Sequence, residues 1–313
     1  MSTKYPAVYL TLLTLFSLLL GISWSHQGIA SEPEPTTLAK NKLVVRITQL
    51  PNTDIDKILY FALLKLALEK SGYPYTIEVT PASLPPVAAR IVSSPEFVNV
   101  VWQGTSREFE EQLLPVRIPL LQGLLGYRVF LIRKERQAAF QAIKSIADLS
   151  RFRALLGSNW SDVNILEAHK LPVILGKYSS LMPMLEANRG DYYPRSILEI
   201  NQELDPAQYP DIGVEQSLLL YYPLAIYFFV APNNQALHDA LYHGLEIAVA
   251  DGSYHKLLMT HPLTRDVLKN LHLLERRLLK IDNPFLTDET RAALAKYSVD
   301  LKTLLTEAAA EAP

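Results

Sequence analysis

The fold is decided by YYPLAIYFFVAPNNQALHDALYHGLEIAVADGSYHKLL, residues 221–258, because a buried strand changes there abruptly into a helix. Residues 224–230 are an unbroken apolar and aromatic run, which suits a strand covered on both faces. Pro232 ends the run, and Asn233 or Asn234 can cap the following helix. Apolar residues then recur at helical spacing, predicting one buried stripe: Leu237, Ala240, Leu241, Gly244, Leu245 and Ala248.

The first thirty residues have the pattern of a secretory signal. Lys4 precedes an apolar run at 7–22, and small residues follow as far as Ala30. Because a membrane-spanning helix needs about 20 apolar residues, a cleaved signal peptide is favoured over an anchor. We expect cleavage after Ala30, or else after Ser25. Residues 31–41 are then predicted to form a disordered leader.

The composition indicates in which compartment the protein works and which class of partner it does not bind. The 313-residue chain has no cysteine, which excludes disulfides, a thiol nucleophile, a thiolate metal site and a lipidated cysteine. An exported chain of this size without disulfides indicates a bacterial periplasm and a core large enough to fold unaided. The formal net charge is −2, so nucleic acid is not an expected partner. At about 100–200 residues per domain, the mature chain should form two lobes.

Alternating strands and helices predict an α/β lobe at the start of the mature chain. We expect strands at 43–47, 76–79 and 98–102, a helix at 56–72 and a shorter helix at 81–94. This order is typical of a mostly parallel sheet.

A second lobe is predicted from the strand at 127–132, which we expect to cross over from the first. Short strands at 154–157 and 171–175 and a helix at 181–187 follow it. Beyond Leu258 the sequence predicts a charged helix, which Asn283 and Pro284 end, and then a helical arm. The leucines at helical spacing in that charged helix are Leu268, Leu271, Leu274 and Leu278.

In their order and spacing, several segments resemble family 3 of the type II periplasmic solute-binding proteins, the group that includes polar amino-acid binders. The similarity runs over about 43–258. Its pieces are the helix at 56–72, GTSREFEE at 104–111, LGSNWSDVNIL at 156–166, RGDYYPRS at 189–196 and the segment ending in DGSYHKLL. The resemblance implies two α/β lobes joined by two crossover hinge strands, with a small-molecule ligand buried between them.

The resemblance also implies how the chain is divided. Residues 224–230 would close the sheet of lobe 2, residues 231–234 would be a hinge, and the helix from Gln235 would return to lobe 1. The expected domains are a signal peptide (1–30), a leader (31–41), lobe 1 (42–126 and 232–281), lobe 2 (127–231) and a C-terminal helical arm (282–313).

Lobe 1 offers the first candidate ligand residues. The resemblance implies that Arg107 pairs with a ligand carboxylate, which a planar guanidinium can hold with two charge-assisted hydrogen bonds. The alternative is a surface arginine balanced by the glutamates that follow it. Trp102, Gln103 and Thr105, at the end of the preceding strand, are expected to line the cleft.

Lobe 2 offers a second set in the loop at 157–162. The resemblance implies that its free backbone amides face the ligand at a helix start, with Ser158, Trp160 and Ser161 nearby. The alternative is an ordinary capped turn. Trp160 either stacks on the ligand or fills the interface between the lobes.

Residues 194–196, Pro-Arg-Ser, depart from the family pattern, because amino-acid binders commonly offer a carboxylate there for the ligand ammonium. Arg195 either adds a second positive charge to the cleft, favouring a ligand with more than one anionic group, or pairs with Glu199 four residues on.

Catalytic signatures are missing from the sequence. There is no Gly-x-Ser-x-Gly, no His-Glu-x-x-His and no phosphate-binding glycine loop, and no two histidines of the mature chain stand four apart. We therefore expect no cofactor, no metal and no enzyme. The expected function is a monomeric periplasmic protein that captures a small polar, anionic or amino-acid-like solute for an inner-membrane permease or a sensor.

Two alternatives remain open. One is a dehydratase-like enzyme on the same scaffold, with Glu199, Asp162 and Arg195 as the candidate acid, base and binding groups. The other is an interaction module that contacts proteins through its basic C-terminal arm.

Overall fold

The computed structural model describes residues 41–49, 54–81, 91, 94–158 and 160–310. The expected signal peptide, nearly all of the leader and most of the helix expected at 81–94 lie outside these residues. Within the described part of the chain, no helix is both long and apolar enough to cross a membrane.

The first lobe begins with a parallel strand pair. β1 (Leu43–Gln49) pairs with β2 (Tyr75–Pro81), and α1 (Leu59–Ser71) connects them, as the sequence predicts. Buried leucines of α1 pack under the sheet because they recur at helical spacing. β1, α1 and β2 therefore form a βαβ unit, in which the helix covers one face of the sheet.

A buried asparagine joins β1 to the next strand, β3 (Val100–Gly104). The backbone N–H of Asn99 donates to the carbonyl of Arg46 at 3.0 Å, and its side chain accepts from the N–H of Arg46 at 2.8 Å. The same side chain donates to the carbonyl of Val44 at 2.8 Å. A single amide thus satisfies backbone groups that would otherwise be left unpaired at this sheet edge.

The strand at the centre of residues 221–258 belongs to lobe 1. β11 (Ile226–Val230) lies between β3 and β4 (Leu114–Val116), antiparallel to both, with Phe228 opposite Trp102 and Val116. The prediction that this run closes the sheet of lobe 2 is therefore wrong. A continuous apolar run indicates burial on both faces, but it does not indicate which sheet buries it.

The return crossing between the lobes accordingly lies before β11. β10 (Leu218–Tyr221) pairs antiparallel with β5 (Tyr127–Arg133) in the second sheet, and Pro223 separates it from β11. The chain thus passes between the two sheets not at 231–234, where the hinge is expected, but at residues 222–225. There the N–H of Tyr222 donates to the carbonyl of Gly126, so the two crossover strands are hydrogen-bonded to each other.

The second lobe is built around β5. β8 (Tyr193–Ser196) and β9 (Ile212–Val214) both pair antiparallel with it. A parallel pair, β6 (Ala154–Gly157) and β7 (Val173–Gly176), adjoins this sheet through a bridge between Ala154 and Tyr192. The helices of this region are α4 (Gln137–Gln141), α5 (Ile146–Leu149), α6 (Ser161–Ala168), α7 (Tyr178–Glu186) and α8 (Ile200–Glu203). Between β3 and β4, lobe 1 carries α3 (Arg107–Gln112).

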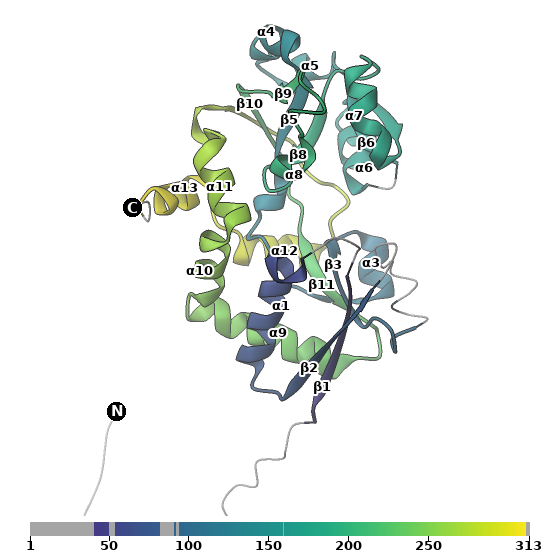
Figure 1. Cartoon of the computed structure of the whole chain (residues 1–313), viewed down its shortest axis with the longest axis vertical. Helices are drawn as coiled ribbons and strands as arrows, with labels where there is room; N and C mark the ends of the chain where they lie inside the picture. Colours follow the sequence, from purple (N-terminus) through teal and green to yellow (C-terminus); the bar gives the residue numbers. More distant parts are fainter. Residues whose placement is uncertain (1–40, 50–53, 82–90, 92–93, 159, 311–313) are drawn as a thin grey trace, which may run out of the picture. The chain divides into compact units, whose positions relative to one another are not determined.

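The predicted helix after β11 is confirmed. α9 (Gln235–Ala250) begins at Asn234, whose side chain accepts from the N–H of Leu237, and ends before Asp251. Its buried residues are the six of the predicted stripe. α9 lies beside α1 (Figure 1), and the close approach depends on a glycine. A Cβ at Gly244 would lie 1.8 Å from the carbonyl oxygen of Ala67.

Replacing Gly244 by alanine is expected to destabilise lobe 1 by about 1–3 kcal/mol, because α9 and α1 must move apart to admit the methyl group. Gly104→Ala is a matched control, since a Cβ at Gly104 meets no atom within 4 Å. Urea unfolding of both variants measures the difference. Equal unfolding midpoints for the two would contradict the close packing of these helices.

The chain beyond α9 returns to the second sheet. After α10 (Ser253–Thr260) and α11 (Pro262–Asn270) it forms β12 (Arg277–Lys280), parallel to β10, where the sequence predicts that the charged helix continues to Asn283. Pairing with β10 outweighs the helical spacing of the leucines.

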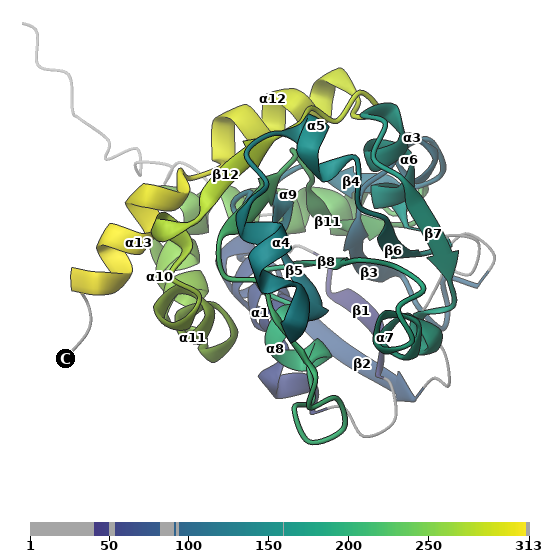
Figure 2. The same cartoon turned by 90° about the horizontal axis from the view of Figure 1, so that it is seen from above.

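The C-terminal arm then crosses back to lobe 1 as α12 (Asp288–Tyr297) and α13 (Leu301–Ala310), and α13 packs against α11 (Figure 2). Four 3-10 turns complete the described elements: η1 (Ile55–Lys57), η2 (Leu124–Gly126), η3 (Lys134–Arg136) and η4 (Leu273–Glu275).

Candidate functional site

A cavity of about 770 Å³ is lined by both lobes, by the crossover strands and by the C-terminal arm. It collects seven of the eight residues expected to bind ligand: Gln103, Thr105, Arg107, Ser158, Trp160, Ser161 and Arg195. They come from the β3–α3 junction, the β6–α6 loop and β8, which are far apart in sequence. This cavity, called the cleft below, is the candidate site.

Trp102 is the predicted residue that the cleft does not include. Its ring stacks on Tyr60 of α1, with centroids 6.0 Å apart, and meets Phe228 edge-on. Tyr60 takes its place in the cleft wall. Burial raises the pKa of Tyr60, and the charge of Glu199 from lobe 2 raises it further, so the hydroxyl stays protonated. Sequence reasoning missed Tyr60 because it lies within a regular helical pattern.

Arg107 is the least committed cation of the cleft. It is the first residue of α3, which Ser106 caps by accepting from the N–H of Phe109 at 3.2 Å. Its side chain is exposed and forms no ion pair with any described residue. Two of the glutamates expected to balance it are engaged elsewhere, since Glu108 accepts from Gln112 and Glu110 pairs with Arg117.

Glu110 fixes α3 from behind. Its carboxylate is 3% exposed, and it forms an ion pair with Arg117 at 3.0 Å. It also accepts from the hydroxyls of Thr105 at 2.5 Å and of Thr287 and Thr290 at 2.7 Å. The hydroxyl of Thr105 is therefore used within lobe 1, and the helix that carries Arg107 is tied to α12 of the C-terminal arm.

A buried ion pair forms the hinge side of lobe 2. Nη2 of Arg128 lies 3.0 Å from Oδ1 of Asp162 and Nη1 lies 3.6 Å from Glu199, while the hydroxyl of Tyr222 donates to Asp162. Burial alone would lower the pKa of Arg128, but the carboxylates of Asp162 and Glu199, together with the neighbouring Tyr222, raise it. Arg128 was missed from the sequence. The available signal was a lone charge within the apolar strand YRVFLI.

The charge of Arg195 is balanced by carboxylates of its own lobe. It pairs with Glu199 at 3.0 Å and with Glu203 at 2.6 Å, so the intramolecular alternative is the one found. Its guanidinium also lies 4.5 Å from the ring centroid of Trp160, which stacks on Tyr193. Trp160 therefore packs within lobe 2 and presents only part of its ring to the cleft.

Several donors around the cleft are left without an acceptor among the described residues. They are Nε2 of Gln103, Nε of Arg128 and Nε of Arg195. α6 begins at Trp160 without a capping side chain, although its N-terminal turn carries Ser161 and Asp162 beside the cleft. Buried donors normally have partners, so a wall with this surplus suits a ligand that brings acceptor oxygens.

Two carboxylates of the cleft, Asp162 and Glu199, are committed to arginines. Asp162 pairs with Arg128, and Glu199 pairs with Arg128 and Arg195. Within the described residues no cluster of three or more His, Cys, Asp or Glu side chains could hold a metal ion. The arrangement can hold and orient a polar molecule, and within the described residues the carboxylates of Asp162 and Glu199 are already paired.

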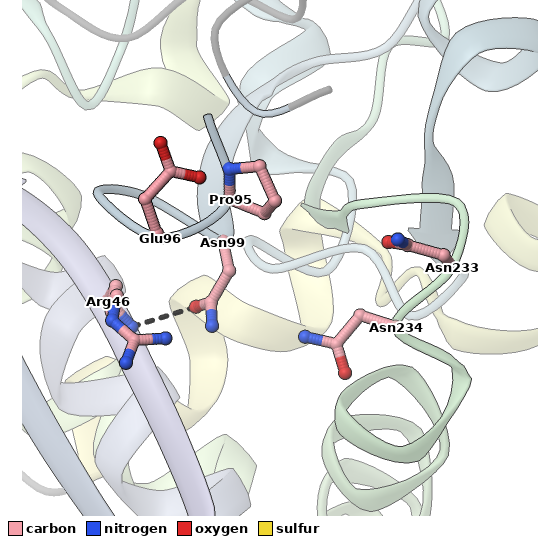
Figure 3. A pocket seen from close by; sticks show the side chains of 6 residues that line it. All are labelled: Arg46, Pro95, Glu96, Asn99, Asn233 and Asn234. Carbon is pink, nitrogen blue, oxygen red and sulfur yellow. Dashed lines mark hydrogen bonds between the residues drawn. The ribbon is translucent and has the colours of Figure 1, made fainter. Parts of the chain in front are cut away.

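A second pocket, of about 340 Å³, lies on lobe 1 (Figure 3). Its polar groups maintain the fold. Arg46 pairs with Glu78 at 2.8 Å, Asn99 bonds to the backbone of Arg46, and Asn234 caps α9. No residue expected to bind ligand lines it, so the cleft remains the candidate site.

Comparison with solved structures found chains to which this chain is similar. The chain is similar to the VFT2 domain of BvgS from Bordetella pertussis, with a TM-score of 0.52 and 15% identity over 69% of this chain and 91% of that one. An amino acid ABC transporter substrate-binding protein from Streptococcus pneumoniae, bound to L-arginine, aligns with a TM-score of 0.49 and 13% identity over 70% of this chain and 93% of that one. A periplasmic binding protein with high arginine specificity from Salmonella typhimurium aligns with a TM-score of 0.48 and 16% identity, over 69% of this chain and 96% of that one.

Scores below 0.5 imply no shared fold by themselves, so the Bordetella domain carries the assignment. The chain has the two-lobed α/β fold of the type II periplasmic binding proteins, as the sequence resemblance implies. Scans of the sequence against protein-family models and against curated proteins found no match.

Proposed function

We propose that this chain is a solute-binding protein that holds a small amino-acid-like carboxylate in the cleft. The observation that carries the proposal is the exposed guanidinium of Arg107, which has no ion-pair partner among the described residues, on a helix that Glu110 holds from behind. A positioned arginine fork suits a carboxylate, which it can bind with two parallel hydrogen bonds. The unpaired Nε2 of Gln103 is a further donor on the same wall.

The charges of the cleft favour a ligand with one carboxylate over a dianion. Arg128 and Arg195 already face Asp162, Glu199 and Glu203, which leaves Arg107 as the uncommitted cation among the described residues that line the cleft. Glu199 is 37% exposed and accepts from the N–H of Ser196, within the segment where amino-acid binders carry a carboxylate. Although Glu199 is paired with Arg128 and Arg195, its exposed part can also accept from a ligand ammonium, four residues beyond Arg195.

The wider role follows from the two-lobed fold and from the expected export to the periplasm. A two-lobed protein closes on its ligand about its crossover strands, exchanging water in the cleft for fixed hydrogen bonds. With a signal peptide at 1–30, the mature protein would act as a monomer in the periplasm and present its ligand to an inner-membrane permease or a sensor. The dehydratase-like alternative is not favoured, because its candidate groups Asp162, Glu199 and Arg195 are paired with one another or with Arg128.

Arg107→Ala tests the proposal. Thermal-shift screening of the chain against amino acids, dicarboxylates and other small anions should find a stabilising solute, because a ligand of the native state raises stability by mass action. The variant should lose about 1.5–3 kcal/mol of binding free energy, the worth of hydrogen bonds to a charged group. Unfolding of the free protein should change little, since Arg107 is exposed.

Arg151→Ala is the matched control, because Arg151 is a surface arginine of lobe 2 with 78% of its side chain exposed. It should bind as the unaltered chain does. If Arg107→Ala keeps the full response to every solute that stabilises the chain, the cleft assignment is wrong.

A further inference from the structure

We infer that the C-terminal arm is part of the ligand site, and that Phe285 makes the cleft select carboxylates with an apolar side chain. The inference rests on the proposed function and adds to it. Residues 283–286, called the NPFL turn below, lie beyond the segment that the family resemblance covers. Asn283, Phe285 and Leu286 nevertheless line the cleft.

The NPFL turn is rigidly attached to the hinge. Asn283 is 2% exposed, and its side chain donates to the carbonyl of Pro223 at 3.0 Å, within the return crossing. Its Oδ1 accepts from the N–H of Phe285 at 3.1 Å, and its carbonyl accepts from Arg291 at 2.6 Å. Pro284 restricts the backbone between them. The backbone that carries Phe285 is therefore held in place before any ligand binds.

The same turn is coupled to the wall that carries Arg107. Thr287 follows the turn and caps α12 by accepting from the N–H of Thr290. Both threonines donate to Glu110, which holds α3 in place. Phe285 and Arg107 are thus presented by two elements that share one buried anchor. The spacing between an apolar contact and a carboxylate contact is fixed by that anchor.

Phe285 is available for contact. It is 46% exposed, whereas the other apolar residues of this wall, Leu224, Ile226 and Leu286, are at most 7% exposed. A large ring left in water at a cavity wall gains stability when apolar ligand surface covers it. The opposite wall offers paired charges from Arg195 and Glu199. A ligand that fits both has a carboxylate for Arg107 and an apolar side chain for Phe285.

The test compares L-leucine with L-alanine, which share one backbone and differ in apolar side chain, by calorimetric titration of the chain and its variants. The unaltered chain should bind L-leucine more tightly than L-alanine. Phe285→Ala should lower the affinity for L-leucine by about tenfold and change the affinity for L-alanine by no more than about twofold. Phe97→Ala is the matched control, since Phe97 is 60% exposed and does not line the cleft.

Three results would overturn the inference. They are an unaltered chain that binds L-leucine no better than L-alanine, a Phe285→Ala variant that keeps the preference, and an equal loss for both probes. The inference can also fail while the proposed function stands. If Arg107→Ala abolishes the response to some carboxylate while Phe285→Ala changes no affinity, the protein is a carboxylate binder whose arm does not select the side chain.

Discussion

Replacing Asp162 by alanine is expected to lower the free energy of unfolding by about 3–5 kcal/mol, because it leaves a buried guanidinium without its main partner. The side chain of Arg128 is 4% exposed and that of Asp162 is 11% exposed, so water cannot take over the missing interaction. Glu199, at 3.6 Å, remains as a longer and more exposed partner. The hydroxyl of Tyr222 also loses its acceptor.

Two further variants separate this effect from general loss of contacts. Tyr222→Phe removes one hydrogen bond to a charged group and should cost about 1.5–3 kcal/mol. Glu78→Ala breaks an ion pair with Arg46 whose side chains are 29% and 54% exposed, and it should cost about 0–1 kcal/mol. Urea unfolding gives all three values. If Asp162→Ala costs no more than Glu78→Ala, Arg128 is not the buried charge described above.

Local structure was predictable wherever neighbouring residues determine it. The stripe from Leu237 to Ala248 has one helical period and a capping asparagine before it, so α9 could be placed nearly to the residue. β1, α1 and β5 follow in the same way from unbroken apolar runs or periodic patterns. These elements require no knowledge of what they pack against.

Sheet membership was not predictable, because it depends on partners distant in sequence. The run at 224–230 is equally apolar whether β3 or β5 lies beside it. β12 illustrates the same limit, since the leucines at 271, 274 and 278 fit a helix until β10 offers an unpaired edge. Pro223, between two apolar runs, was the local sign that the chain leaves one sheet before entering another.

The candidate site divides in the same way. Arg107, Gln103 and the loop at 157–162 could be proposed from sequence because the family resemblance fixes their order along the chain. Arg128 and Phe285 could not, because their place in the cleft comes from a mid-strand charge and from an arm outside the resemblance. Trp102 shows the opposite error, since strand alternation turns it toward Tyr60.

The second large effect is expected at Glu215, which joins β12 to the sheet of lobe 2. Glu215→Ala should lower the free energy of unfolding by about 3–5 kcal/mol. The side chain is fully buried, and it accepts from the backbone N–H groups of Ser217 and Leu218 at 2.8 and 2.7 Å and from Gln137 at 2.8 Å. It also lies 3.8 Å from Arg276, which is itself 4% exposed.

Removing Glu215 should release one segment before the rest. Arg276 immediately precedes β12, whose ends are fixed by bonds from the N–H of Arg277 to Ser217 and from the N–H of Ile281 to Tyr221. Hydrogen exchange should therefore accelerate at Arg277 and Ile281 more than in β1 or α1. The side chain of Glu275 nearby is 79% exposed. The free energy of unfolding of Glu275→Ala should therefore lie within about 0.5 kcal/mol of that of the unaltered chain.

Glu215 also tests whether the arm acts on the cleft through its attachment. It does not line the cleft, yet β12 leads directly into the NPFL turn. If that attachment positions Phe285, Glu215→Ala should lower the affinity for L-leucine more than the affinity for L-alanine, under conditions where the variant is still folded. Protection of Ile281 equal to that of the unaltered chain, together with an unchanged L-leucine affinity, would mean that Asn283 and α12 alone hold the turn in place.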